Sequence, residues 1–167
     1  MKSRKTNLVA GLALMTALIL PALCFWMPVE GAQSSPNAES QRIDGTWRVQ
    51  VTIRDCTSGA ALRTFPAFLT FAQGGTLTET TTGFPPSLRT PGHGFWSHLT
   101  GHGYSAVSEA FLFNPAGVWT GRQRLTQVIE IGDQANELSS TAINEIFDTN
   151  GNLIVNGCAT AVGSRME

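Results

Sequence analysis

Three histidines lie close together, and histidine is the side chain best suited to proton transfer near neutral pH. His93 and His102 each stand between two glycines, and His98 lies between them. On a continuous strand His98 and His102 would share one face. With Glu79 or Glu109 they could then hold Zn²⁺. The spacing matches no established zinc signature, however, and glycine-flanked histidines usually occupy turns, so we expect no metal, no cofactor and no catalytic residue here.

The segment from Arg89 to Trp96 combines a cation, a proline-containing loop and two aromatic rings. Such a composition is typical of the opening of a ligand-binding cavity. The only tyrosine follows soon after the segment. The residues expected to contact a ligand are therefore Arg89, His93, Trp96 and Tyr104. The alternative is a structural loop that packs over one end of the fold, with Tyr104 in the core.

Four glutamates fall within predicted strands: Glu79, Glu109, Glu130 and Glu145. Two of them pointing inward could form an acid–base pair of the kind that glycosidases use. Glutamates on the solvated face of a strand are the commoner case. The sequence contains no nucleophile elbow, phosphate loop, dinucleotide fingerprint or His-Glu-x-x-His motif, so we assign no catalytic residue.

Residues 1–32 have the pattern of a Sec-type signal peptide. Lys2, Arg4 and Lys5 precede an apolar run, and small residues near Gly31 offer a cleavage site. We therefore predict a secreted or periplasmic protein, with a signal helix at 1–32, a disordered lead-in at 33–43 and a folded domain at 44–167. An uncleaved signal would be the only contact with a membrane. A lipidated Cys24 is a second alternative.

The folded domain is patterned as strands throughout. Trp47, Val49, Val51 and Ile53 alternate with polar residues, which indicates a strand with one buried and one wet face. Glycine, proline and asparagine punctuate the chain at regular intervals. The strands predicted in this way are 46–53, 65–71, 76–82, 94–100, 104–113, 118–131, 138–147 and 153–162.

Eight consecutive strands with mostly short turns form an up-and-down meander. An open sheet of this size would leave two unpaired edges and one exposed apolar face, and closure removes both problems. We therefore predict an all-β fold, a single eight-stranded antiparallel up-and-down β-barrel. A barrel of about eight strands has room for packed side chains or for one small ligand. A two-sheet sandwich is the alternative.

Two cysteines remain after the signal peptide. Cys56 follows the first predicted strand and Cys158 lies in the last, and these strands are neighbours in a closed meander. An even pair in an exported domain is typical of a disulfide. We predict a Cys56–Cys158 bridge, with two free cysteines as the alternative.

The run Gly45-Thr46-Trp47 opens the first strand in the way that the G-x-W motif opens the first strand of lipocalins and related calycins. In that superfamily a basic residue near the end of the last strand lies across the tryptophan ring. Arg165 stands at about that place, so the chain resembles a small secreted bacterial calycin-like barrel. The resemblance implies that Trp47 and Arg165 plug one end of the barrel by a cation–π contact.

The charge composition limits the classes of partner that the protein could bind. The formal net charge is −1, and after the signal peptide acidic residues outnumber basic ones without a basic stripe, which argues against nucleic acid as a partner. The favoured function is binding of a small apolar or amphipathic ligand, and an enzyme is the less favoured class. One alternative is a filled structural or interaction barrel. The other is a small enzyme resembling cyclase or dirigent barrels, which would need Arg89, His93 or Tyr104 in a cavity.

Overall fold

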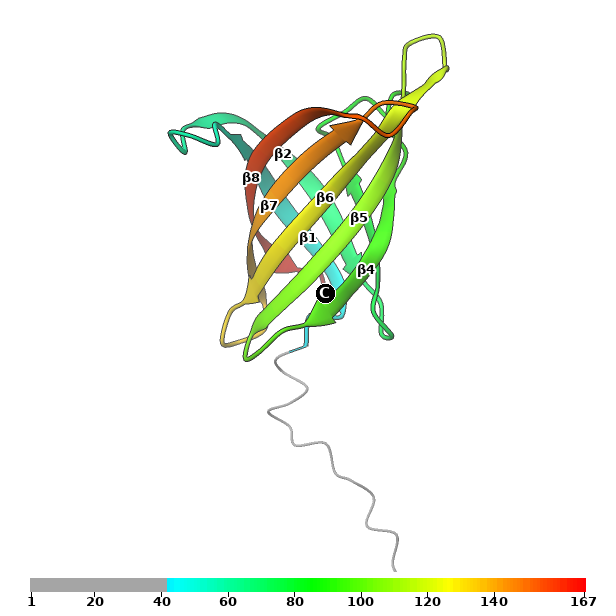
Figure 1. The fold of residues 1–167 in the computed structure, drawn as a ribbon. Coiled ribbons are helices and arrows are strands. Elements are labelled where there is room, and N and C mark those ends of the chain that lie inside the picture. The colour runs from blue at the N-terminus through cyan, green and yellow to red at the C-terminus, as the bar shows by residue number, and fades with distance from the viewer. Residues whose placement is uncertain (1–41) are drawn as a thin grey trace, which may run out of the picture. The chain divides into compact units, whose positions relative to one another are not determined.

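The computed structural model describes residues 42–167, which form a closed antiparallel barrel. Each strand pairs with the next along the chain, and β8 returns to pair with β1 (Figure 1). The strands are β1 (Gly45–Arg54), β2 (Ala61–Phe71), β3 (Thr76–Thr81), β4 (Gly92–His98), β5 (Gly103–Phe113), β6 (Trp119–Ile131), β7 (Glu137–Phe147) and β8 (Leu153–Arg165). The predicted eight-stranded up-and-down barrel is therefore confirmed, and the sandwich is not formed.

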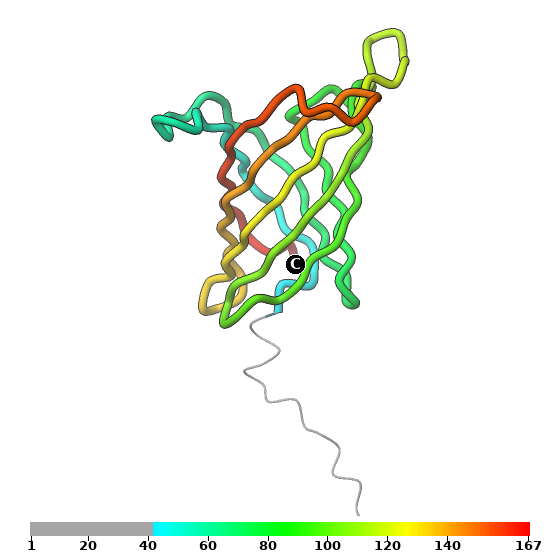
Figure 2. Tube along the Cα trace, in the orientation of Figure 1, coloured from blue at the N-terminus to red at the C-terminus, as the bar shows by residue number. Residues whose placement is uncertain are grey.

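The alternation read from the sequence decides which side chains face inward. In β1 the side chains of Trp47 and Val49 are buried, whereas Arg48 and Gln50 are exposed. A one-residue slip in register would exchange the two faces, so burial of the apolar set fixes the pairing with both neighbours. The trace in Figure 2 shows the strands wound obliquely around one interior.

Some boundaries differ from those predicted. β4 ends at His98 and does not continue to residue 100, because the chain turns back at Thr100–Gly103 with a hydrogen bond between the Gly103 amide and the Thr100 carbonyl. β8 runs to Arg165, three residues beyond the predicted end. The predicted signal helix and most of the lead-in lie outside the described residues. Ile43, the last residue of the predicted lead-in, is fully buried in the core.

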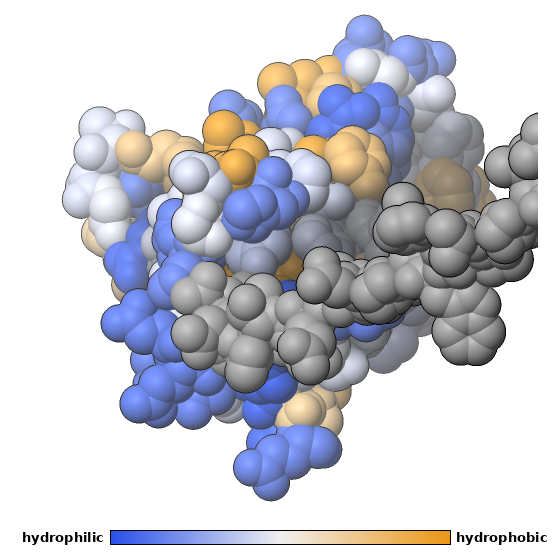
Figure 3. Space-filling model, turned by 90° about the horizontal axis from the view of Figure 1, so that it is seen from below, coloured by the Kyte–Doolittle hydropathy of each residue, from blue (hydrophilic) through white to orange (hydrophobic). Residues whose placement is uncertain are grey.

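The lower end of the barrel, where β1 begins and β8 ends, is packed solid. Large side chains that are less than 2% exposed meet there: Ile43, Trp47, Phe71, Leu77 and Ile129. Seen from below (Figure 3), the visible surface around this end mixes hydrophilic and hydrophobic residues. Buried aromatic and aliphatic side chains therefore form the interior of this half of the barrel.

Arg165 lies across this lower end. Its Cζ atom is 4.4 Å from the centre of the Trp47 ring. Its Nε donates to the Ala135 carbonyl at 2.9 Å, and its other nitrogens donate to the carbonyls of Arg42 and Asp44. A Cβ at Gly45, which has a φ of +125°, would lie 2.6 Å from an Arg165 nitrogen. The glycine of the G-x-W run is therefore needed for its backbone conformation, and a side chain there would displace the Arg165 guanidinium.

A disulfide joins Cys56 to Cys158, as predicted. Cys56 lies in the turn after β1, and Cys158 lies on β8 opposite Arg54. The bridge therefore spans the seam at which the first and last strands close the barrel. None of the residues 42–167 belongs to a helix that could cross a membrane.

Candidate functional site

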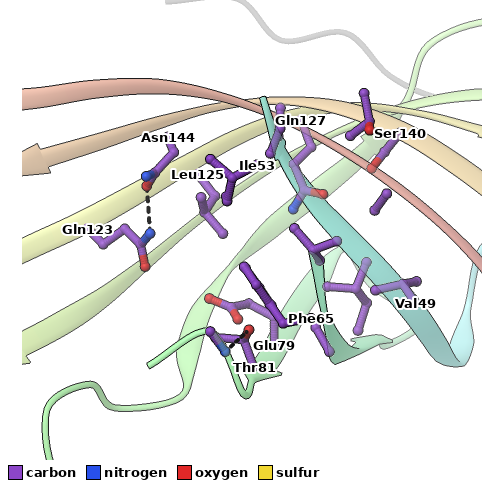
Figure 4. Close-up of a pocket in the computed structure, with 18 of the residues that line it drawn as sticks. Val49, Ile53, Phe65, Glu79, Thr81, Gln123, Leu125, Gln127, Ser140 and Asn144 are labelled. Atoms are coloured by element: carbon purple, nitrogen blue, oxygen red, sulfur yellow. Dashed lines mark hydrogen bonds between the residues drawn. The ribbon is translucent and has the colours of Figure 1, made fainter. Parts of the chain in front are cut away.

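The upper half of the barrel is hollow. A cavity of about 200 Å³ opens inside it, above the packed base, and its lining comes from strands on several sides of the barrel (Figure 4). β7 and β8 face this space with small side chains, Ala142, Ala159 and Ala161. For scale, an apolar cavity of about 150 Å³ accepts one benzene molecule. The space therefore suits a ligand slightly larger than one aromatic ring.

One side of the cavity is apolar apart from Arg63, which lies on β2 and is exposed. The lining residues of β1 and β2 include Val49, Val51, Ile53, Phe65 and Leu69. All of them sit at alternate positions along their strands, so they are the continuation of the buried face that packs the base. Exclusion of water from this wall would favour a ligand by roughly 25 cal/mol for each Å² of apolar surface buried.

The other side holds a buried polar network. The carboxylate of Glu79 on β3 accepts a hydrogen bond from Arg89, and the side chains of both residues are 3% exposed. Arg89 Nε donates to Gln123 Oε1 on β6 at 2.6 Å. Gln123 Nε2 in turn donates to Asn144 Oδ1 on β7 at 2.6 Å, as Figure 4 shows. The opposite charges of Glu79 and Arg89 cancel, so the network as a whole is neutral.

The long connection between β3 and β4 carries Arg89 into the barrel. Prolines keep this segment out of regular pairing until Arg89, which forms an isolated bridge with Leu112 of β5. The Thr90 amide then bonds the Phe111 carbonyl at 3.1 Å. Anchored to β5 in this way, the Arg89 side chain is directed inward to Glu79 and Gln123.

Two more polar side chains line the cavity below the network. Gln127 is 5% exposed and Ser140 is 7% exposed. The Ser140 hydroxyl has no hydrogen-bond partner among the described residues. The side-chain amide of Gln127 likewise makes no hydrogen bond to another residue of 42–167. Figure 4 shows this side chain directed into the cavity. Buried polar groups are rarely left without partners, so these two groups are available to a ligand.

The four residues predicted to contact a ligand do not form one site. Arg89 lines the cavity. His93 is exposed on the outer face of the barrel. Trp96 and Tyr104 pack edge to face in the base, with ring centres 5.7 Å apart. Tyr104 lies in the core, which is the alternative given for it from the sequence, and it is only 5% exposed. Burial raises the pKa of its phenol above the usual range.

The histidines and glutamates are also dispersed. His98 ends β4 and His102 lies in the following turn, 3.5 Å from Asp133. No group of three metal-ligating side chains occurs within the described part of the chain. Glu109 lies outside the barrel, where it receives hydrogen bonds from Arg122 and Arg124 at 3.0 and 2.8 Å.

The parity of strand positions in the sequence indicates the polar lining. Glu79 has the same parity as Leu77 on β3, and Gln123 and Gln127 have the same parity as Ile129 on β6. Period two therefore places these polar residues inside once the buried apolar neighbour is recognised.

No family model matches the chain and neither does any curated protein.

Proposed function

We propose that this protein is an exported barrel that binds a small amphipathic molecule in the upper half of its interior. The cavity carries this proposal, because its lining on β1 and β2 is apolar except for Arg63, whereas β6 and β7 contribute the polar side chains of Gln123, Gln127, Ser140 and Asn144. Small-molecule sites have this character, a mostly apolar concave surface with a few placed polar groups. A filled structural barrel would have larger side chains at Ala142, Ala159 and Ala161.

Export is part of the same proposal. The Cys56–Cys158 bridge supports it, because structural disulfides persist in oxidising compartments and are rare in the cytosol. The basic and apolar segments of residues 1–32 would act as the export signal.

Native mass spectrometry tests the proposal directly. The full chain is expressed with its own N-terminal segment, purified from the exported fraction without reductant, and sprayed from ammonium acetate. We expect a mature chain beginning near residue 32, and addition of toluene should give a one-to-one complex. Xenon, observed by its NMR shift, is an independent probe of the same space. A barrel that takes up neither toluene nor xenon would overturn ligand binding, and a chain retained in the cytosol would overturn export.

A further inference from the structure

The ionic character of the cavity lining limits which ligands it can hold. The two charged groups buried in the lining, Glu79 and Arg89, are paired with each other. The third charged residue of the lining, Arg63, is exposed at the solvent side and donates to the Gly83 carbonyl at 2.6 Å. Arg89 has further donors engaged by Gln123 and by its neighbour's carbonyl at Thr90. A ligand anion would have to compete with Glu79 for Arg89, and a ligand cation would have to compete with Arg89 for Glu79. Either choice leaves a third charge buried without its own counterion, which is costly.

The unsatisfied groups are neutral. Gln127 carries an amide, which offers both donors and an acceptor, and Ser140 carries a hydroxyl that can act in either sense. They occupy adjacent strands: Gln127 is opposite Ala142 and Ser140 is opposite Ile129 in the β6–β7 pairing. Two residues apart on the same inner face, they are diagonal neighbours, which lie roughly 7–8 Å apart. One small polar group of a ligand can therefore bond to both.

We infer that the cavity selects an uncharged molecule of about one ring, whose single polar group both donates and accepts hydrogen bonds at Gln127 and Ser140. A primary amide or a comparable neutral group meets this description, and a carboxylate of the same shape does not. The ring lies against the apolar wall of Val49, Val51 and Leu69. This inference rests on the proposed ligand binding and adds the charge and polarity of the ligand.

Three probes of similar size separate the possibilities. Toluene has no polar group, benzamide has a neutral donor and acceptor, and benzoate is the anion of nearly the same shape. Their binding to the disulfide-intact protein at pH 7 is measured by ligand-observed NMR. We expect benzamide to bind about tenfold more tightly than toluene, as two net hydrogen bonds would give. Benzoate should bind at least tenfold more weakly than benzamide.

Two variants test the residues named. Gln127→Leu combined with Ser140→Ala should reduce benzamide to the affinity of toluene while toluene binding persists, which also shows that the variant is folded. Glu79→Gln should improve benzoate relative to benzamide by about tenfold or more, because Arg89 is then left without its counterion. Thr126→Leu, on the outer face of β6, is the matched control and should change none of these ratios.

The possible outcomes distinguish failure of this inference from failure of the proposed function. If benzoate binds the unmodified protein as well as benzamide does, or if the Gln127–Ser140 variant keeps the preference for benzamide, this inference is wrong although ligand binding stands. If toluene and benzamide both fail to bind, the proposed function itself is wrong. Selective loss of benzamide binding with retained toluene binding supports both.

Discussion

Arg165 covers the face of Trp47, with its Cζ atom 4.4 Å from the ring centre, and donates hydrogen bonds to the backbone carbonyls of Asp44 and Ala135. We expect Arg165→Ala to lower the free energy of unfolding by about 3 kcal/mol, because one cation–π contact and several charge-assisted hydrogen bonds are lost together. Urea unfolding followed by tryptophan fluorescence measures the change. Arg165→Lys keeps the charge without the planar fork and should lose less. A loss of under 0.5 kcal/mol (about the scatter of surface substitutions) in the alanine variant would contradict this role.

Loss of the disulfide should weaken the barrel strongly. The bridge joins residues separated by 102 positions, and the chain-entropy model assigns about 4–5 kcal/mol to a loop of that length. We expect the double variant Cys56→Ser, Cys158→Ser to unfold at a clearly lower urea concentration than the oxidised protein. Reduction of the unmodified protein with dithiothreitol should give the same shift. Equal midpoints for oxidised and reduced protein would show that the seam is held by strand pairing alone.

Filling the cavity should remove binding without unfolding the protein. Ala142 lines the space, so Ala142→Leu adds apolar volume where the structure has room. We expect toluene binding to disappear while stability is unchanged or rises by about 1 kcal/mol. Thr141→Leu, exposed on the same strand, is the control and should bind toluene normally. Retained binding in Ala142→Leu would place the ligand elsewhere.

The buried ion pair should behave as a unit. Arg89→Met leaves Glu79 charged and unpaired inside the barrel, for which we expect a loss of about 3–5 kcal/mol. Replacing both residues with methionine removes the stranded charge and should recover most of that loss. A double-mutant cycle by urea denaturation gives the coupling, and simple additivity of the two single variants would argue against the pairing.

The single tyrosine gives a direct readout of the packed base. Burial raises the pKa of Tyr104 in the folded protein. The unfolded chain therefore gives up this proton first, and stability falls as the pH rises from about 10 through the folded-state pKa. Absorbance at 295 nm should titrate higher in native than in urea-unfolded protein. Tyr104→Phe should remove the alkaline loss of stability, and identical titrations in both states would contradict the burial.

The sequence predicted the strands, the disulfide and the closed end of the barrel better than it predicted the residues that line the cavity. Alternation in β1, the cysteine pair and the G-x-W run depend on local pattern, and the structure contains the strand, the bridge and the Trp47–Arg165 contact. The polar lining depends on which strands cross the interior opposite one another. The partnership of Glu79 with Arg89 is set by the path of the β3–β4 connection, which no local period encodes. Closeness in sequence groups His93 with Arg89, yet strand alternation turns the His93 side chain outward.

The position of the disulfide has a consequence for resistance to proteolysis. Exposed turns such as Pro115–Gly117 are natural cleavage points. A cut at any one site between Cys56 and Cys158 leaves both fragments covalently joined, with strands on each side of the cut still paired. A single nick would therefore release nothing, and the cavity could outlast the integrity of the chain that built it.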